Sequence, residues 1–218
     1  GTWVGIGVVD TNFTLNGGAI IGNQKDCVNS SYFYQNSASL KLEAETEKNV
    51  DTKIEAGNII DVYVDFDNDK ILYWNNSEFL GYMSSSKIKQ NKLFACANLS
   101  SNTKVAFLNR DAPQLPLPKD LKPKNHDNDV LMKPAYNYSI TWKWSTSLKA
   151  SSVVLSGGNE VASRPSTEGS NPAILAGLPL SSTHNHFRVQ IQSIGKWIGI
   201  GFSDEKYQLN DGSTLGSQ

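Results

Sequence analysis

A repeated segment constrains this chain more than any other feature of its sequence. Trp3-Val4-Gly5-Ile6-Gly7 near the start returns as Trp197-Ile198-Gly199-Ile200-Gly201 near the end. The similarity continues at the same offset, with Leu15-Asn16-Gly17-Gly18 against Leu209-Asn210-Asp211-Gly212. Self-similarity at one fixed offset is the signature of a repeated structural unit. We therefore expect the chain to be a segment of a longer protein, beginning inside one unit and ending inside the next.

The overall composition excludes several classes of function. The 218 residues are 39% hydrophobic and 19% charged, with a formal net charge of −1. This is the composition of an ordinary globular protein. A near-neutral chain offers no electrostatic attraction for nucleic acid or for an anionic membrane. No apolar run approaches the ~20 residues that a membrane-spanning helix needs. We expect neither nucleic acid nor membrane among the partners.

The two cysteines predict a location. Cys27 and Cys96 lie far apart, in or near apolar sequence of strand type. A secreted domain stabilised by disulfides would carry more cysteines. Sequons such as Asn98-Leu99-Ser100 point to secretion instead, but a chain rich in Asn and Ser forms them by chance. We expect reduced thiols and an intracellular, cytoplasmic protein.

Apolar residues alternate with polar ones in most segments. In Ile59–Phe66, the residues Ile60, Val62, Val64 and Phe66 face one way, whereas the intervening Asp61, Tyr63 and Asp65 face the other. This period of two is typical of a β-strand with one buried face and one wet or half-wet face. Further strands are expected at residues 39–43, 71–74, 93–99, 104–108, 140–144, 152–155 and 187–192. Glu43–Asn49 has helix-forming residues but no apolar face, so we expect a loop or at most one turn. The chain is predicted to be almost wholly β.

A turn with several acidic residues separates two of these strands. Asp65-Phe66-Asp67-Asn68-Asp69 begins like a calcium loop of the EF-hand type. That loop needs Gly at position six and Glu at position twelve, where this chain has Lys70 and Asn76. Asn and Asp also tolerate the left-handed backbone of tight hairpins. The sequence therefore predicts a hairpin turn here rather than a metal site.

Two histidines form the other candidate for a metal site. His184 and His186 are two positions apart, so on a strand they would share a face. No nearby Cys, Asp or Glu completes a ligand set, and no catalytic-zinc motif is present. We expect a structural role for both residues, with no bound metal and no cofactor.

The segment between residues 112 and 134 interrupts the strand pattern. It contains five prolines among Lys, Asp and Asn. Proline cannot donate to a β-ladder, and proline-rich polar sequence is typical of an extended linker. The sequence thus predicts three parts: residues 1–110, an extended and mobile Pro-rich linker at 111–135, and residues 136–218.

Several motifs, taken in order, resemble those of SPRY (B30.2-type) domains. Residues 1–110 resemble the C-terminal two thirds of such a domain, in Trp3–Gly7, Ile54–Val62, Ile71–Asn76 and Leu93–Leu99. Residues 136–218 resemble the N-terminal half of a second SPRY domain, through segments that include His186–Ile191. The resemblance implies an antiparallel two-sheet β-sandwich of the concanavalin-like type, a SPRY jelly roll, that serves in protein interaction.

A half-sandwich leaves an apolar sheet face and open strand edges exposed. Since each large apolar side chain contributes ~1.5–3 kcal/mol on burial, a sandwich that lacks a whole facing sheet would not be stably folded. We therefore expect residues 136–194 to complete the first sandwich in permuted order, bringing Leu155, Leu180, Phe187, Val189 and Ile191 against Val62, Val64 and Phe107. Trp197–Gly201 would then be surplus, and we expect it to be frayed, added at an edge, or swapped into a neighbouring molecule as domain-swapped self-association.

In SPRY domains, loops at one rim of the sandwich present variable residues to partners. By position, these loops are Thr11–Gly18, Ser100–Asn102, Ser163–Pro172 and the duplicate loop Glu205–Gly212. Arg164-Pro165 resembles the end of the Arg-Arg-Pro segment with which SOCS-box SPRY proteins contact an acidic, Asn-rich peptide. The aromatic anchors that would accompany it are not found in the other two loops, which offer Asn16-Gly17-Gly18 and Ser100-Ser101, whereas binding hot spots favour Trp, Tyr and Arg. The residues expected to contact a partner are Asn12, Phe13, Leu15, Ser100, Asn102, Arg164, Pro165 and Tyr207.

Catalysis has little support in the sequence. Neither a Gly-x-Ser-x-Gly nucleophile elbow nor a phosphate-binding P-loop occurs. We expect a non-catalytic protein–protein interaction module, serving as a scaffold or recruiting substrates to a ubiquitin ligase whose RING, HECT or SOCS-box segment lies elsewhere. The alternative is a lectin-like carbohydrate-binding sandwich. Its aromatic platform would be Trp74 with Asn75 and Asn76, or Tyr32 with Tyr34.

Overall fold

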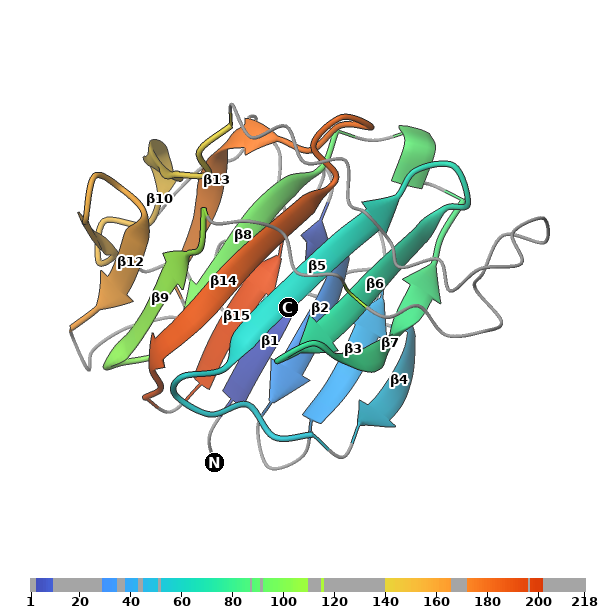
Figure 1. Ribbon diagram of the computed structural model, residues 1–218. Helices are drawn as coiled ribbons and strands as arrows, with labels where there is room; N and C mark the ends of the chain where they lie inside the picture. The colour runs from blue at the N-terminus through green and yellow to red at the C-terminus, as the bar shows by residue number, and fades with distance from the viewer. Residues whose placement is uncertain are drawn as a thin grey trace, which may run out of the picture.

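The computed structural model describes residues 3–9, 29–34, 38–42, 45–50, 52–86, 88–90, 92–109, 115, 140–165, 172–195 and 197–201. Two β-sheets lie face to face (Figure 1). In this described part of the chain, the only helical element is the short 3-10 turn η1, Ile88–Gln90. The prediction of an all-β, two-sheet sandwich is confirmed.

Eight strands form the sheet that we call sheet A. Their order across the sheet is β10 (Trp144–Lys149), β13 (Ala173–Pro179), β8 (Phe94–Leu99), β15 (Trp197–Gly201), β1 (Trp3–Val9), β2 (Asn29–Tyr34), β3 (Ala38–Leu42) and β4 (Glu45–Val50). Seven strands form sheet B. Their order is β11 (Val154–Ser156), β12 (Val161–Arg164), β9 (Thr103–Phe107), β14 (His186–Ser193), β5 (Ile59–Asp65), β6 (Lys70–Asn75) and β7 (Glu78–Ser84).

Strands from the two ends of the sequence interleave in both sheets. In sheet B, β14 lies between β5 and β9, with Phe187 opposite Val62 and Val189 opposite both Ile60 and Phe107. In sheet A, β13 pairs with β8. These pairings join strands that are distant in sequence. Neither residues 1–110 nor the residues after 140 therefore form the sheets from their own strands alone.

The core fills the space between the sheets. The inward-facing residues of β5 and β14 are fully buried, as their alternating patterns predicted: Ile60, Val62, Val64, Phe187, Val189 and Ile191. Phe107 stacks on Trp144, with ring centroids 4.1 Å apart, and meets Phe187 edge to face at 6.4 Å. Since each large apolar residue contributes ~1.5–3 kcal/mol on burial, residues 140–195 supply a large part of what stabilises the sandwich.

The outer face of sheet B differs from the wet or half-wet face expected from the sequence. Leu72 and Trp74 point away from the main core, yet they are 1% and 0% exposed, and they pack with Leu115. Leu115 comes from the stretch predicted to be a mobile linker, and it is itself fully buried. Within that stretch, Leu115 is anchored in this way because an apolar side chain gains more by covering Trp74 than by staying in water.

The second copy of the repeat does not lie where it was expected. β15 is neither frayed nor at an edge: it lies inside sheet A, between β8 and β1 (Figure 1). It pairs with β1 in parallel, each residue opposite its own repeat, and with β8 in antiparallel fashion. An interior position pairs the ladder groups of β15 on both sides, whereas an edge or frayed strand would leave one side or both sides unpaired.

Two local expectations also changed. Glu45–Val50 forms the edge strand β4, not a loop or helical turn, because pairing with β3 provides backbone partners that an isolated polar segment lacks. The strand expected at residues 140–144 begins only at Trp144. By contrast, the hairpin between β5 and β6 is as predicted. Asp65 accepts hydrogen bonds from the backbone of Asp67 and Asn68, and Asp69 has a φ of 53°.

Candidate protein-interaction rim

Three connections meet at one end of the sandwich. The turn between β8 and β9, the start of the loop after β12, and the connection after β14 lie together, because Arg164 is opposite Thr103 and Ser193 is opposite Lys104. Pro172, just before β13, joins them through its carbonyl, which accepts the backbone N–H of Leu99 at 3.0 Å. We call residues 99–103, 164–165, 172 and 193–195 the rim.

Hydrogen bonds between these connections fix the shape of the rim. The backbone N–H of Asn102 donates to the carbonyl of Arg164 at 2.8 Å. The Ser193 hydroxyl donates to the carbonyl of Asn102 at 2.9 Å, and the N–H of Gly195 donates to Oγ1 of Thr103 at 3.1 Å. A surface whose loops are already held in place loses less conformational entropy when a partner binds.

A close approach of two backbones explains Gly195. A Cβ at this position would overlap the carbonyl oxygen of Ser101. Only glycine therefore allows the connection after β14 to lie against the turn between β8 and β9. Gly195, Ser193 and Thr103 were not predicted, because no sequence signal places them beside Asn102.

Two of the residues expected to contact a partner are buried. Arg164 is 3% exposed, and its Nη1 donates to the carbonyl of Leu99 at 3.3 Å. Ser100 is 1% exposed, and its hydroxyl shares a 2.8 Å hydrogen bond with the hydroxyl of Thr103. In this conformation both side chains hold the rim together and are not accessible to a partner. The alternation in Val161–Arg164 carried the missing signal, since it places Arg164 on the same face as the buried Ala162.

Asn102 and Pro165 are the expected residues that the rim does expose. Asn102 has a φ of 61°, a left-handed conformation that asparagine tolerates better than most residues. Because the N–H of Asn102 bonds to Arg164, the preceding neighbour of Pro165, the two exposed residues belong to adjoining segments.

The remaining expected contact residues, Asn12, Phe13, Leu15 and Tyr207, lie outside the described residues. Among the described residues, β1 ends with Val9 opposite Phe94, at the end of β8 away from Ser100.

A buried ionic cluster ties β14 to β5. Nε2 of His186 lies 2.8 Å from Oδ1 of Asp61, and Nε of Arg188 donates to the same oxygen at 3.0 Å. The Asp61 side chain is 0% exposed, and those of His186 and Arg188 are 1% and 13% exposed. Hydrogen bonds between charged groups are stronger than neutral ones. The carboxylate is fully engaged by its neighbours, so the cluster acts in stability.

The two histidines do not form a common site. Nδ1 of His184 lies 2.8 Å from the hydroxyl of Thr183, whereas His186 bonds to Asp61. Within the described ranges, no group of three or more His, Cys, Asp or Glu side chains is arranged to hold a metal ion.

Burial also raises the pKa of two other side chains, those of Tyr63 and Cys96. It raises the pKa of the Tyr63 phenol, with a smaller contribution from Asp65, and it raises the pKa of the Cys96 thiol well above its usual value. Cys96 is a free, buried cysteine. Since the thiolate is the reactive form, burial and the raised pKa lower the reactivity of Cys96. Cys27 lies outside the described residues.

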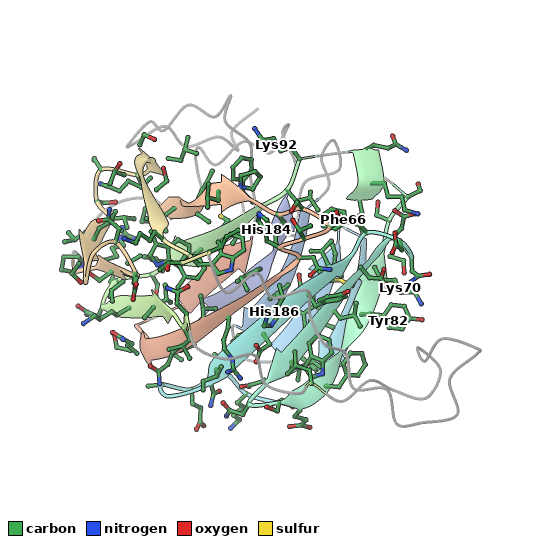
Figure 2. All side chains as sticks on the ribbon, turned by 45° about the horizontal axis from the view of Figure 1, so that its top comes forward. Phe66, Lys70, Tyr82, Lys92, His184 and His186 are labelled. Atoms are coloured by element: carbon green, nitrogen blue, oxygen red, sulfur yellow. The ribbon has the colours of Figure 1, made fainter. Side chains whose placement is uncertain are left out.

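The first aromatic platform proposed for a sugar is not available at the surface. Trp74 and Asn75 are 0% and 2% exposed, and Trp74 packs edge to face on Phe79 at 5.3 Å. The amide oxygen of Asn76 accepts the backbone N–H of Ile59, so it holds the turn. The side chains of Tyr32 and Tyr34 lie outside the described part. Elsewhere, exposed Tyr82 lies at the outer strand β7 beneath the ammonium of Lys70, 4.6 Å from its ring (Figure 2).

Two facing β-sheets, with hydrogen-bonded loops at one end, define this fold as a β-sandwich. The SPRY domain family model matches residues 1–110, which is half of the chain, and the chain therefore belongs to the SPRY domain family. Domains of this family generally serve in protein interaction. No curated protein and no solved structure matches the chain significantly. The described residues include no helix with the length and apolar character to cross a membrane.

Proposed function

We propose that this chain is a non-catalytic module that binds a peptide or protein partner at the rim. The observation that carries the proposal is the set of hydrogen bonds that joins three connections into one fixed surface around Asn102 and Pro165. Binding residues commonly lie on loops positioned by a rigid scaffold, and the two packed sheets are such a scaffold.

The two exposed residues limit the chemistry of the partner. The amide of Asn102 both donates and accepts hydrogen bonds, which suits a peptide backbone or an amide side chain. Pro165 adds a rigid apolar surface, and ordering it on binding costs little entropy. With Arg164 buried, the rim lacks the exposed guanidinium that would attract an acidic peptide. The expected ligand is therefore a polar, uncharged peptide segment with a small apolar residue.

A wider role follows from this binding activity. Within a larger protein, the module would act as a scaffold or recruit substrates to a ubiquitin ligase. The two parts of the chain, residues 1–110 and 136–218, would then belong to neighbouring SPRY units that share one sandwich. The free, buried Cys96 supports a cytoplasmic location, because such thiols are usual in reducing compartments.

A displayed peptide library, selected on the purified chain, tests the proposal. The informative variants are Asn102→Lys in the rim and Asn159→Lys at the opposite end of β12. Both asparagines have a positive φ, 61° and 70°, so the two substitutions impose a similar backbone strain. We expect selected peptides to lose at least about tenfold in affinity for Asn102→Lys, which is about 1.4 kcal/mol. Asn159→Lys should bind them as the unmodified chain does.

Equal binding to both variants would show that the rim is not the binding surface. A glycan array on the same protein distinguishes the alternative. Binding to glycans without any selected peptide would replace the protein-binding proposal with the lectin-like one.

A further inference from the structure

Strands β1 and β15 both pair with β8, and they do so in one shared register. β15 pairs Ile198 with Leu99 and continues to Gly201 opposite Cys96. Gly201 is the repeat of Gly7, and the residue after Gly7 in β1, Val8, faces Ala95, the neighbour of Cys96. Along β8, residues Cys96–Leu99 therefore pair with β15, and Phe94 and Ala95 pair with β1 in the same register.

The contact between the two copies is unlike the rest of the sheets. β1 and β15 are parallel, with Trp3 opposite Trp197 and Ile6 opposite Ile200. Every other strand pairing described for the two sheets is antiparallel. Parallel pairing is slightly less stable per residue than antiparallel pairing. β15 therefore separates β1 from most of β8, where the shared register would let β1 pair in antiparallel fashion from Val4 to Val9.

This arrangement lowers the cost of releasing β15. Losing an interior strand normally leaves two unpaired edges, which is unfavourable. Here β1 can close onto β8 in the same register, so sheet A stays continuous from β13 to β2. The connection from Ser193 at the end of β14 to Trp197 at the start of β15 is short. Short connections favour exchange of a strand between molecules over its return within one molecule.

We propose that the slot between β8 and β1 accepts strand β15 from a second copy of this chain. The slot consists of Cys96–Leu99 on one side and Trp3–Ile6 on the other, and it pairs with Trp197–Gly201 of the donor. Every backbone hydrogen bond made within one chain can form between two chains. Exchange of an identical element is a low-cost route to dimers. The exchange needs no partner bound at the rim, although the connection that must open begins at rim residues 193–195.

Cysteine pairs at one register position test the exchange. Counting along the β15–β8 ladder, Ile200 is opposite Ala97. Neighbouring antiparallel residues have Cα atoms about 4.5–5.5 Å apart, which suits a disulfide, whereas strands two apart are about 9.5 Å distant and cannot be bridged. All variants carry Cys27→Ala and Cys96→Ala, so that only the introduced thiols react. One protein then carries Ile200→Cys and the other carries Ala97→Cys.

The two proteins are mixed, incubated at high concentration, oxidised gently and separated on a non-reducing gel. We expect a disulfide-linked heterodimer, because neither protein can form the bond within one chain. Its yield should rise with protein concentration during the incubation. The matched control replaces Ala97→Cys with Val154→Cys, an exposed residue in sheet B that should give at most a trace of heterodimer.

A further variant shows the other half of the exchange. Ile6→Cys with Ala97→Cys in one chain forms an intrachain disulfide only when β1 has closed onto β8, since Ile6 is the repeat of Ile200. Near-UV circular dichroism of the reduced proteins verifies that each variant is folded. If folded mixtures give no more heterodimer with Ala97→Cys than with Val154→Cys at any concentration, the proposal is wrong.

Discussion

Strands β14 and β15 follow one another in the sequence and both lie inside a sheet, but they differ in what could replace them. β14 lies between β5 and β9 in sheet B, and no other segment of the chain repeats its sequence. β15 lies between β8 and β1 in sheet A, and β1 repeats it. The position of β14 in its sheet can therefore be occupied by one segment of the chain, whereas the position of β15 can be occupied by two.

The side chains of β14 explain why its position is specific. Phe187, Val189 and Ile191 are fully buried against both sheets, and Arg188 and His186 bind the buried carboxylate of Asp61. A substitute strand would need the same apolar spacing on one face and the same two cationic or polar groups on the other. The repeat supplies such a substitute for β15 and none for β14.

The largest expected effect comes from placing proline in the middle of β14. Val189→Pro removes a ladder donor from an interior strand and disturbs a fully buried site. Proline inside regular structure costs about 3 kcal/mol or more. Since no other segment can take this place, we expect the variant to show no cooperative unfolding in urea. A transition with the midpoint of the unmodified chain would contradict the specific role of β14.

Breaking the ionic cluster should have the next largest effect. Asp61→Asn leaves Arg188 and His186 beside a neutral amide, and removing one partner of a buried ion pair costs about 3 kcal/mol at the lower end of the usual range. The matched control is Lys89→Met, which removes the exposed pair between Lys89 and Asp69 at 3.5 Å. We expect about 0–1 kcal/mol for the control. Urea unfolding of both variants measures the difference, and equal losses would show that the cluster does not secure β14.

Proline in β15 should have a smaller effect than proline in β14. Ile200→Pro disturbs β15, but β1 can close onto β8 in its place. We expect a loss of about 1 kcal/mol, near the centre of the range for ordinary point substitutions. A loss as large as that of Val189→Pro would show that β1 cannot replace β15.

The smallest expected effect concerns the thiol of Cys96, which faces Gly201 across the β8–β15 ladder. Burial raises its pKa in the folded state above the usual value of 9.0. The stability gained from the protonated thiol is complete below that usual value and is lost as the pH rises through the folded pKa. In a Cys27→Ala background, we therefore expect stability to fall at alkaline pH, and to fall less when Cys96→Ala is also present. An identical pH dependence with and without Cys96 would contradict this.

Local sequence patterns predicted much of the fold. Alternation over residues 59–66 and 187–192 identified β5 and β14 and the face that each buries, because a strand needs apolar residues at every second position. The Asp65–Asp69 turn followed from local side-chain chemistry. The edge strand β4 was missed, because its polar residues form a strand only by pairing with β3.

The candidate site was harder to predict because it depends on non-local contacts. Burial of Arg164 results from its packing beside Leu99, and the need for Gly195 results from the approach of Ser101. Leu115 also lacked a local signal, since its partners Leu72 and Trp74 are distant in sequence. The register that lets β1 and β15 share β8 was visible only after the sheet had been assembled.

The most direct test of this account is the unfolding of residues 1–110 expressed alone. This fragment contains β5, β8 and β9 but lacks the strands β12, β13 and β14 that pair with them. We predict a fragment without a cooperative urea transition, which regains one when residues 136–218 are added as a separate chain. If residues 1–110 alone unfold cooperatively as a monomer, the sandwich does not require the second part of the chain, and the account is contradicted.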